Sequence, residues 1–404
     1  MYLNNFEEHM LGGSEGLGKS IAMKLLVSLG EMFDADSLIP ITRAHWALSG
    51  QEGDLYFAEM LANGGASTSV PVTTNPAWDP DLRQEFGVSI SEYELSLLNR
   101  TIGISNRLGV IKSFNCTPYI HNEVPSLGEH TAFSESSATP YINSVYGART
   151  NRESSASALA AGIIGKTPNY GLHLDENRVP NVLVSLDLPD LDDYEIGILG
   201  WYLGDLLEPD NIPLITGMKG LPNPESLRDF GSLLNTSGAV SMYHLAGLTP
   251  EAKDPKKVDR WSKGLEKITV TSNDLNSIKE EFSSKSGEIN SVYMGCPHST
   301  VNEIIKVNTL LGDRKVKDGV SFLIFTSSTN ISILKQGNIL DKLGEKGIHV
   351  IKDSCVDEPV FKFTEGKLGA TNSAKCAYYR QRRNQEFAIL GIEDIVEASV
   401  RGYL

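Results

Sequence analysis

Short apolar runs of strand type alternate with helical segments from residue 182 onward. Strands are expected at 182–186, 213–216 and 239–244, with helices at 194–207 and 224–234 between them. A second series places strands at 267–270, 291–295, 320–325 and 347–353 among helices at 273–282, 300–311, 331–343 and 392–401. Strands that alternate with helices form βαβ units and parallel sheets. The sequence therefore predicts an α/β fold with parallel sheets.

The chain has 404 residues, which is too long for one simple core, so two or three domains are expected. Residues 253–263 are charged and interrupted by proline, which is typical of a boundary. We expect an N-terminal lobe with site-forming loops at 1–178 and a first α/β unit at 179–262 that packs on this lobe. A second α/β domain would occupy 263–404.

The net charge of -15 disfavours a nucleic-acid or anionic-membrane partner, because either would need a basic face. No apolar run reaches the roughly 18 residues that a membrane span requires. Glu7 and Glu8 stand where a secretory signal would carry bases. The four cysteines are far apart, so reduced thiols in the cytoplasm fit better than a disulfide framework.

Residues 13–20 match the phosphate-loop pattern G-x-x-x-x-G-K-S letter for letter. A phosphate loop needs a buried strand that leads into the glycines. The preceding residues 5–11 are instead acidic and helical in pattern. We interpret the match as a turn between two helices and treat nucleotide binding as a distant alternative.

Residues 114–152 lack helical or strand periodicity over much of their length and are rich in small residues, carboxylates and arginines. Such a segment is either a linker or a functional site held by a scaffold. Aromatic and aliphatic residues interleave with the polar groups, which argues against a linker. We interpret the segment as part of a site.

Three cysteines have contexts that point to a site. Cys296 and Cys355 each follow an expected strand, at the sheet edge where parallel sheets bind ligands, and Cys116 lies in the irregular segment. Three thiolates from separate segments indicate a metal or cluster with one open coordination position. The alternative is three unrelated buried thiols. Cys376 follows no expected strand, and we interpret it as a buried structural thiol.

Several charged residues could act on an anionic substrate. Arginine suits bidentate pairing with carboxylate and phosphate groups, although surface ion pairing is the expectation for Arg382 and Arg383. His45 and His173 are as compatible with a structural role as with catalysis. The cationic candidates are Arg149, Arg152, Arg178, Lys375, Arg380, Arg382 and Arg383, and the acid–base candidates are Glu129, His130 and Glu135.

Several strings of the sequence resemble the aconitase X family. They are Gly128-Glu129-His130 through Ala138, Tyr146 through Glu153, Gly165 through Pro168, Tyr170 through His173, residues 372–378 and the contexts of Cys116, Cys296 and Cys355. The similarity covers nearly the whole chain. It implies an aconitase-like arrangement of α/β lobes around a central iron–sulfur cluster and the dehydration of a β-hydroxy acid.

The family includes single-chain enzymes with a fused swivelling domain and two-chain enzymes whose large subunit lacks that domain. This chain leaves no room for the extra domain, so it resembles a large subunit. The resemblance implies a small-subunit partner that carries the swivelling domain and a catalytic serine. It also implies a small anionic substrate, (R)-5-phosphomevalonate, dehydrated to trans-anhydromevalonate 5-phosphate in isoprenoid synthesis.

The family's functional positions carry over onto this sequence. Cys116, Cys296 and Cys355 would hold the cluster, as 4Fe–4S or, after isolation, 3Fe–4S. Glu135, Ser136 and Lys375 would be the catalytic residues. The substrate pocket would be lined by Ser49, Gly50, Gln51, Asn75, Pro76, Glu135, Ser136 and Lys375, with Arg149 and Arg152 as anion-binding residues.

Two alternatives stay open at this point. One is a two-chain dehydratase that acts on cis-3-hydroxy-L-proline or another hydroxy acid. The other is a non-enzymatic iron–sulfur or zinc protein whose thiols are structural.

Overall fold

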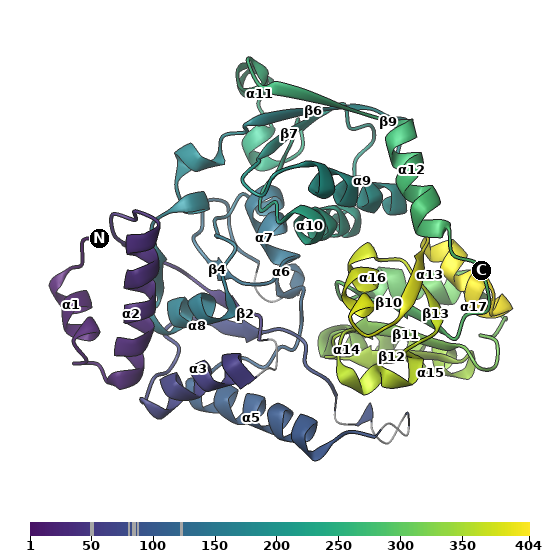
Figure 1. Cartoon of the computed structure of the whole chain (residues 1–404), viewed down its shortest axis with the longest axis horizontal. Helices are drawn as coiled ribbons and strands as arrows, with labels where there is room; N and C mark the ends of the chain where they lie inside the picture. The colour runs from purple at the N-terminus through teal and green to yellow at the C-terminus, as the bar shows by residue number, and fades with distance from the viewer. Residues whose placement is uncertain (49–51, 80, 83–85, 87–88, 122–123) are drawn as a thin grey trace.

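The computed structural model describes residues 1–404 except 49–51, 80, 83–85, 87–88 and 122–123. Three lobes follow one another along the chain and surround a common centre (Figure 1). In the described part of the chain, no helix combines the length and apolarity needed to cross a membrane.

The N-terminal lobe contains a small parallel sheet with the strand order β3-β2-β4. Its strands are β2 (Ala44–Trp46), β3 (Val72–Thr74) and β4 (Ala132–Phe133), and β1 (Leu38–Pro40) pairs separately with β5 (Lys166–Pro168). Helix α8 (Ser155–Ile164) packs directly on the sheet, because a Cβ atom at Gly162 would lie 2.4 Å from Cγ2 of Val72. The other main helices are α1 (Asn5–Leu11), α2 (Leu17–Met32), α3 (Glu52–Asn63) and α5 (Glu92–Leu108).

Two sequence interpretations are confirmed in this lobe. Residues 12–16 form a turn between α1 and α2, so no strand leads into the phosphate-loop pattern. The irregular segment folds into short pieces, α6 (Pro118–His121), β4, α7 (Ala138–Tyr141) and a π-helix (Ile142–Tyr146), whose side chains are largely buried. The segment therefore belongs to the packed lobe and is not a linker.

The middle lobe is a four-stranded parallel sheet in the order β8-β7-β6-β9. Its strands are β6 (Val182–Asp187), β7 (Pro213–Thr216), β8 (His244–Leu245) and β9 (Glu266–Thr271). Its helices are α9 (Asp193–Leu206), α10 (Pro224–Gly238), α11 (Pro255–Ser262) and α12 (Ser272–Ser283).

The boundary expected at residue 262 differs from this arrangement. Strand β9 pairs with β6 along six residues, so it completes the middle sheet and does not begin the last domain. The charged residues expected to mark the boundary include α11. Local composition could not reveal a pairing between strands that lie about 80 residues apart, because register is set by long-range packing.

The C-terminal lobe is a five-stranded parallel sheet in the order β12-β11-β10-β13-β14. Its strands are β10 (Ser291–Met294), β11 (Ser321–Thr326), β12 (Ile348–Lys352), β13 (Leu368–Thr371) and β14 (Glu386–Ile389). Its helices are α13 (Val301–Leu311), α14 (Ser328–Gln336), α15 (Ile339–Glu345), α16 (Ala374–Gln381) and α17 (Ile392–Arg401).

Elements β13, α16 and β14 were not predicted from the sequence, because they are short and the residues of α16 show only weak amphipathic periodicity. The helix expected at 331–343 is two helices, α14 and α15. They are separated by Asn338, whose left-handed φ of 52° ends the first and starts the second.

Helices α9 and α10 touch through glycine. A Cβ atom at Gly200 would lie 2.4 Å from the carbonyl oxygen of Phe230, whereas a Cβ atom at Gly197 would come no closer than 3.4 Å to its nearest neighbour, Cδ1 of Leu233. Backbone atoms cannot move aside as the end of a flexible side chain can. The close packing of α9 and α10 therefore requires that residue 200 has no side chain.

We expect Gly200→Ala to lower the free energy of unfolding by about 1–3 kcal/mol, because the added methyl group pushes the two helices apart. Gly197→Ala is the matched control in the same helix and should be neutral or stabilising, since alanine is the better helix former. Urea unfolding of both variants measures the difference. Equal stability of the two would contradict the packing account.

Candidate active site

Two sheets present their carboxyl ends to the same region. In the N-terminal lobe β2 is flanked by β3 and β4, and in the C-terminal lobe β10 is flanked by β11 and β13. Each arrangement is a switch point of strand order, the place where parallel sheets bind ligands. Asn75 follows β3, Glu135 follows β4, Cys296 follows β10 and Lys375 follows β13.

A buried ion pair joins the two edges. Nζ of Lys375 donates to Oε1 of Glu135 at 2.8 Å and to Oγ of Ser136 at 2.8 Å. Lys375 is 4 % exposed and Glu135 is 6 % exposed, so the pair is shielded from water. An ammonium group has three donors, and its bonds with the described residues use two of them. Within that part of the chain, Lys375 keeps one N–H for a ligand.

The carboxylate of Glu135 is held by a chain of hydrogen bonds within the N-terminal lobe. Nδ2 of Asn75 donates to Oε2 of Glu135 at 2.7 Å, and Nε2 of His45 donates to Oδ1 of Asn75 at 2.7 Å. Nδ1 of His45 then accepts from Oγ1 of Thr73 at 2.8 Å. This network assigns the neutral tautomer of His45, and burial lowers the pKa of His45 accordingly. We therefore assign His45 a structural role.

The charges of the pair follow from its surroundings. Burial raises the pKa of Glu135, but the charge and hydrogen bond of Lys375 outweigh it and lower the pKa to about 2. Burial opposes the charge of Lys375 as well, and Glu135 outweighs it, so the pKa of Lys375 is raised well above its ordinary value. Both groups are ionised at neutral pH.

The three cysteine segments meet beside this pair. The backbone N–H of Cys355 donates to the carbonyl of Ala77 at 2.9 Å, which joins the end of β12 to the segment after β3. Oγ of Ser137 donates to the carbonyl of Cys116 at 3.0 Å, and Oγ of Ser373 donates to the carbonyl of Cys296. Cys116, Cys296 and Cys355 are each half-buried.

His298 connects all three segments, and the sequence analysis gave it no role. Its backbone N–H donates to Sγ of Cys116 at 3.2 Å, and its Nε2 donates to the carbonyl of Ser354 at 3.0 Å. The residue itself lies just beyond Cys296. The sequence signal was the string Cys296-Pro297-His298, in which a histidine follows a cysteine at a strand end.

The donor set fits an iron–sulfur cluster. Burial raises the pKa of the Cys116 thiol to about 12 and raises the pKa values of Cys296 and Cys355 well above their ordinary value. A coordinating metal deprotonates such thiols. Within the described residues, no three His, Cys, Asp or Glu side chains converge to hold a single metal ion. Thiolates that bind different irons of one cluster need not converge on one point.

Cys376 lies near Cys296 but differs from these three cysteines in its surroundings. It follows β13, which the sequence analysis had missed, yet its side chain is 1 % exposed, hydrogen-bonds Thr371 and lies in the hydrophobic core. The interpretation as a buried structural thiol is confirmed.

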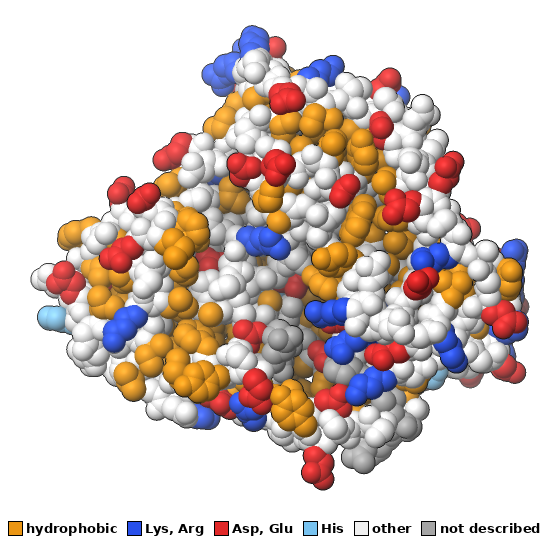
Figure 2. Space-filling view, in the orientation of Figure 1, with side chains coloured by type: hydrophobic (Ala, Val, Ile, Leu, Met, Phe, Trp, Pro, Cys, Tyr) orange, Lys and Arg blue, Asp and Glu red, His pale blue; other side chains and the backbone are white. Residues whose placement is uncertain are grey.

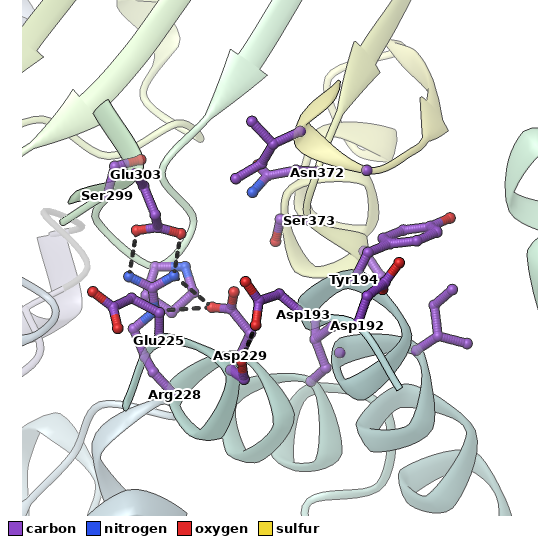
Figure 3. Close-up of a pocket in the computed structure, with 18 of the residues that line it drawn as sticks. Asp192, Asp193, Tyr194, Glu225, Arg228, Asp229, Ser299, Glu303, Asn372 and Ser373 are labelled. Carbon is purple, nitrogen blue, oxygen red and sulfur yellow. Dashed lines mark hydrogen bonds and ion pairs between the residues drawn. The ribbon is translucent and has the colours of Figure 1, made fainter. Parts of the chain in front are cut away.

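Two cavities flank the network. The larger, of about 730 Å³, lies between the middle and C-terminal lobes and reaches Cys296 and Ser373. Figure 3 shows its acidic wall, where Asp192, Asp193 and Asp229 lie near the fork formed by Arg228 and Glu303. The second, of about 690 Å³, includes Asn75 and Pro76 and is bounded by the C-terminal lobe. On the face shown in Figure 2, basic side chains gather along the edge of the C-terminal lobe that faces the N-terminal lobe.

The remaining predicted residues have different positions. Ser49, Gly50 and Gln51 lie outside the described residues. Arg149 pairs with Asp175 and donates to the carbonyl of His173 at 3.3 Å, and Arg152 lines a separate cavity of about 450 Å³. The contacts described for these two arginines do not bring them to Lys375.

The other charged candidates have structural partners. Nδ1 of His130 lies 3.0 Å from Nδ1 of His173, and burial lowers the pKa of His173 to about 3. Glu129 pairs with Arg43 at 2.7 Å, and buried Arg178 pairs with Glu251. Nε of buried Arg380 donates to Gln385 at 2.9 Å.

Comparisons with known proteins agree with this architecture. Family models for the first, second and third domains of aconitase X match residues 1–176, 180–280 and 289–401. The crystal structure of Thermococcus kodakaraensis aconitase X in its holo form covers 99% of this chain and 100% of that chain, with a TM-score of 0.89 and 31% sequence identity.

Curated relatives match at full length. The phosphomevalonate dehydratase large subunits of Thermococcus kodakarensis and Methanocaldococcus jannaschii are each 34% identical to this chain, across 98% of it and 99% and 100% of their own lengths. The cis-3-hydroxy-L-proline dehydratase of Pseudomonas aeruginosa is 33% identical across 99% of this chain, but only 70% of that protein is covered.

The fold and the meeting of two sheet edges at a cysteine-bearing cleft define an aconitase-like α/β protein. Within that class, the chain belongs to the aconitase X family.

We expect Lys375→Met to cost about 3–5 kcal/mol of folding free energy at neutral pH, because it leaves Glu135 buried without its cation. In the parent, the pKa of Glu135 is depressed from 4.5 to about 2, so its contribution is present above pH 4.5 and is lost as pH falls toward 2. In Lys375→Met, burial dominates and raises the pKa of Glu135. The unfavourable contribution of Glu135 to folding should therefore shrink as pH falls from 7 toward 4.5.

Urea unfolding across this pH range measures both effects, with the double variant Lys375→Met, Glu135→Gln as control. The double variant should be more stable than Lys375→Met at pH 7, and the gap should narrow toward pH 4.5. If the two variants are equally stable at pH 7, Glu135 does not depend on Lys375 for its charge.

Proposed function

We propose that this chain is the large, catalytic subunit of a hydro-lyase that dehydrates (R)-5-phosphomevalonate to trans-anhydromevalonate 5-phosphate. The observation that carries the proposal is the convergence of three cysteine segments with the buried Lys375–Glu135 pair. It occurs in a chain that matches the large subunits of phosphomevalonate dehydratases along 98% of its length.

In this proposal Cys116, Cys296 and Cys355 hold an iron–sulfur cluster, as 4Fe–4S or as 3Fe–4S after loss of one iron. The group would supply a Lewis acid for the hydroxyl that leaves. All three thiols are half-buried and Cys296 lines a cavity, which supports this role because a catalytic metal needs a position open to substrate. A structural zinc site would need four converging ligands, which the described residues do not offer.

The polar network would hold and orient the substrate. Lys375 keeps one N–H, which can donate to the substrate carboxylate and stabilise negative charge that develops there as the neighbouring carbon loses a proton. Glu135 is ionised, so it can accept a hydrogen bond from the substrate but has no proton to give at neutral pH. Ser136 donates to Oε1 of Glu135 at 3.0 Å and would fix the position of that oxygen.

The base that removes the proton would come from a second chain. Relatives named as large subunits imply a small-subunit partner. Among the described residues of the network, Glu135 accepts hydrogen bonds from four donors and Lys375 is protonated. Neither is therefore well suited to accept a proton from carbon. We propose that a serine of the small subunit does so.

We expect Cys116→Ser, Cys296→Ser and Cys355→Ser each to lose most iron and acid-labile sulfide after anaerobic purification with the small subunit, since each thiolate would bind one iron. Cys376→Ser is the matched control and should keep both. Metal and sulfide analysis gives the result without an activity assay. Equal dependence on all four cysteines, or a folded parent without iron, would contradict the three-thiolate site.

The isolated chain, fully loaded with cluster, should bind (R)-5-phosphomevalonate but turn it over at least about a hundredfold more slowly than the two-chain enzyme. The reason is that general-base catalysis contributes roughly 10²–10⁴-fold. Steady-state assays with and without the small subunit measure the ratio. Equal turnover would place the base on this chain.

A further inference from the structure

The second cavity leads from the catalytic network to a pair of arginines. On one side it is lined by Asn75 and Pro76, which follow β3, and Asn75 is hydrogen-bonded to Glu135. On the other side it is lined by Asp357, Arg382 and Arg383 of the C-terminal lobe. A molecule in this cavity could therefore contact the network at one end and the two guanidinium groups at the other.

The two arginines share one carboxylate. Arg382 pairs with Asp357 at two points, since its Nε donates to Oδ1 at 3.1 Å and its Nη2 pairs with Oδ2. Nη2 of Arg383 donates to the backbone carbonyl of Asp357 at 2.9 Å, and Nε of Arg383 lies 3.5 Å from Oδ1 of Asp357. Each guanidinium has five N–H donors, and its contacts with the described residues leave some of them unused.

One unused donor is buried. Among the residues that the structure describes, Nε of Arg383 makes no hydrogen bond, although the atom is removed from solvent, because the 3.5 Å to Asp357 is an ion-pair distance without hydrogen-bond geometry. A buried donor without a partner costs free energy, so such a group indicates a missing acceptor. Of the other acidic residues of the wall, Glu52 pairs with Arg100 at 2.8 Å and Glu94 pairs with Lys362 at 3.1 Å. Glu358 lies near Arg383, whose charge lowers its pKa, but burial outweighs that effect and raises the pKa of Glu358 to about 8, so this acid is largely neutral at pH 7.

Helix α16 connects Lys375 of the network to Arg382 of the cavity wall. Lys375 lies in its first turn and Arg382 follows its last residue, about two turns further along. The ring of Tyr379 lies between them, 5.9 Å from Nζ of Lys375 and 5.6 Å from Cζ of Arg382. One element therefore presents separate cations for two anionic groups of one substrate.

We propose that Arg382 and Arg383 form a subsite for the phosphate group of the substrate, while the carboxylate end lies near Lys375. Arginine is suited to this task, because its planar fork pairs with two phosphate oxygens at once. Both residues were expected to form surface ion pairs, and both do pair with Asp357, but they also line the cavity. The inference rests on the proposed function and specifies how the phosphorylated substrate would be recognised.

The test uses the two-chain enzyme with Arg382→Gln, Arg383→Gln and the double variant. Arg401→Gln is the matched control, since Arg401 is exposed and 3.9 Å from Glu397. The probes are (R)-5-phosphomevalonate, (R)-mevalonate and inorganic phosphate. The double variant should lose at least about tenfold in kcat/KM for the phosphorylated substrate, chiefly through KM, and inorganic phosphate should inhibit it more weakly than the parent.

The preference for (R)-5-phosphomevalonate over (R)-mevalonate should fall by the same factor, whereas Arg401→Gln should match the parent. An unchanged KM, or equal loss with both substrates, would overturn the inference, provided that iron content and melting temperature match the parent. If the parent does not dehydrate (R)-5-phosphomevalonate, the proposed function fails. Calorimetry with inorganic phosphate would then still test the subsite. Loss of phosphate binding in the double variant would support it, and retained binding would overturn it.

Discussion

The ion pair between Lys375 and Glu135 is the interaction on which the site depends. It joins residues that are 240 positions apart and belong to different lobes, and it does so where two parallel sheets end. Two charges removed from water are stable only when each satisfies the other and the remaining hydrogen-bonding groups are occupied. The bonds from Asn75 and Ser136 meet that requirement. The lobes are consequently held in a fixed relation at the point where chemistry is proposed.

In the same region, ordinary hydrogen bonds organise the three cysteine segments. His298 contacts Cys116 and Ser354 while it is itself carried by the segment of Cys296. Ser137 and Ser373 anchor the backbone of two of the cysteines. Partners of this kind orient metal ligands and tune their properties. The relative positions of the three thiols therefore rest on short polar contacts as much as on the sheets.

Much of this arrangement follows from local sequence. Strands such as β6, β7 and β11 are apolar runs bounded by clear helix signals, so their positions were predictable. Cys296 and Cys355 were recognisable because each follows such a run. The pairing of β9 with β6 was not, since the partner of a strand depends on contacts far away in the chain.

The positions of the arginines were equally beyond local reasoning. Arg149 and Arg152 stand in the most site-like stretch of sequence, yet their described contacts lie elsewhere. Arg382 and Arg383 follow a helix that the letters did not reveal, and they line a cavity. Charge alone does not say which cation faces a cleft. Only the fold of β13 and α16 decides that.

Helix α16 also limits how this part of the chain can vary in length. Each residue of an α-helix turns the chain by about 100° and advances it by about 1.5 Å. An insertion or deletion between Lys375 and Arg382 would therefore change the distance between the two cations and the direction in which one of them points. Substitution at an outward position such as Tyr378, which is 52% exposed, carries no such penalty. The spacing of the two cations therefore constrains the length of this helix more than its composition.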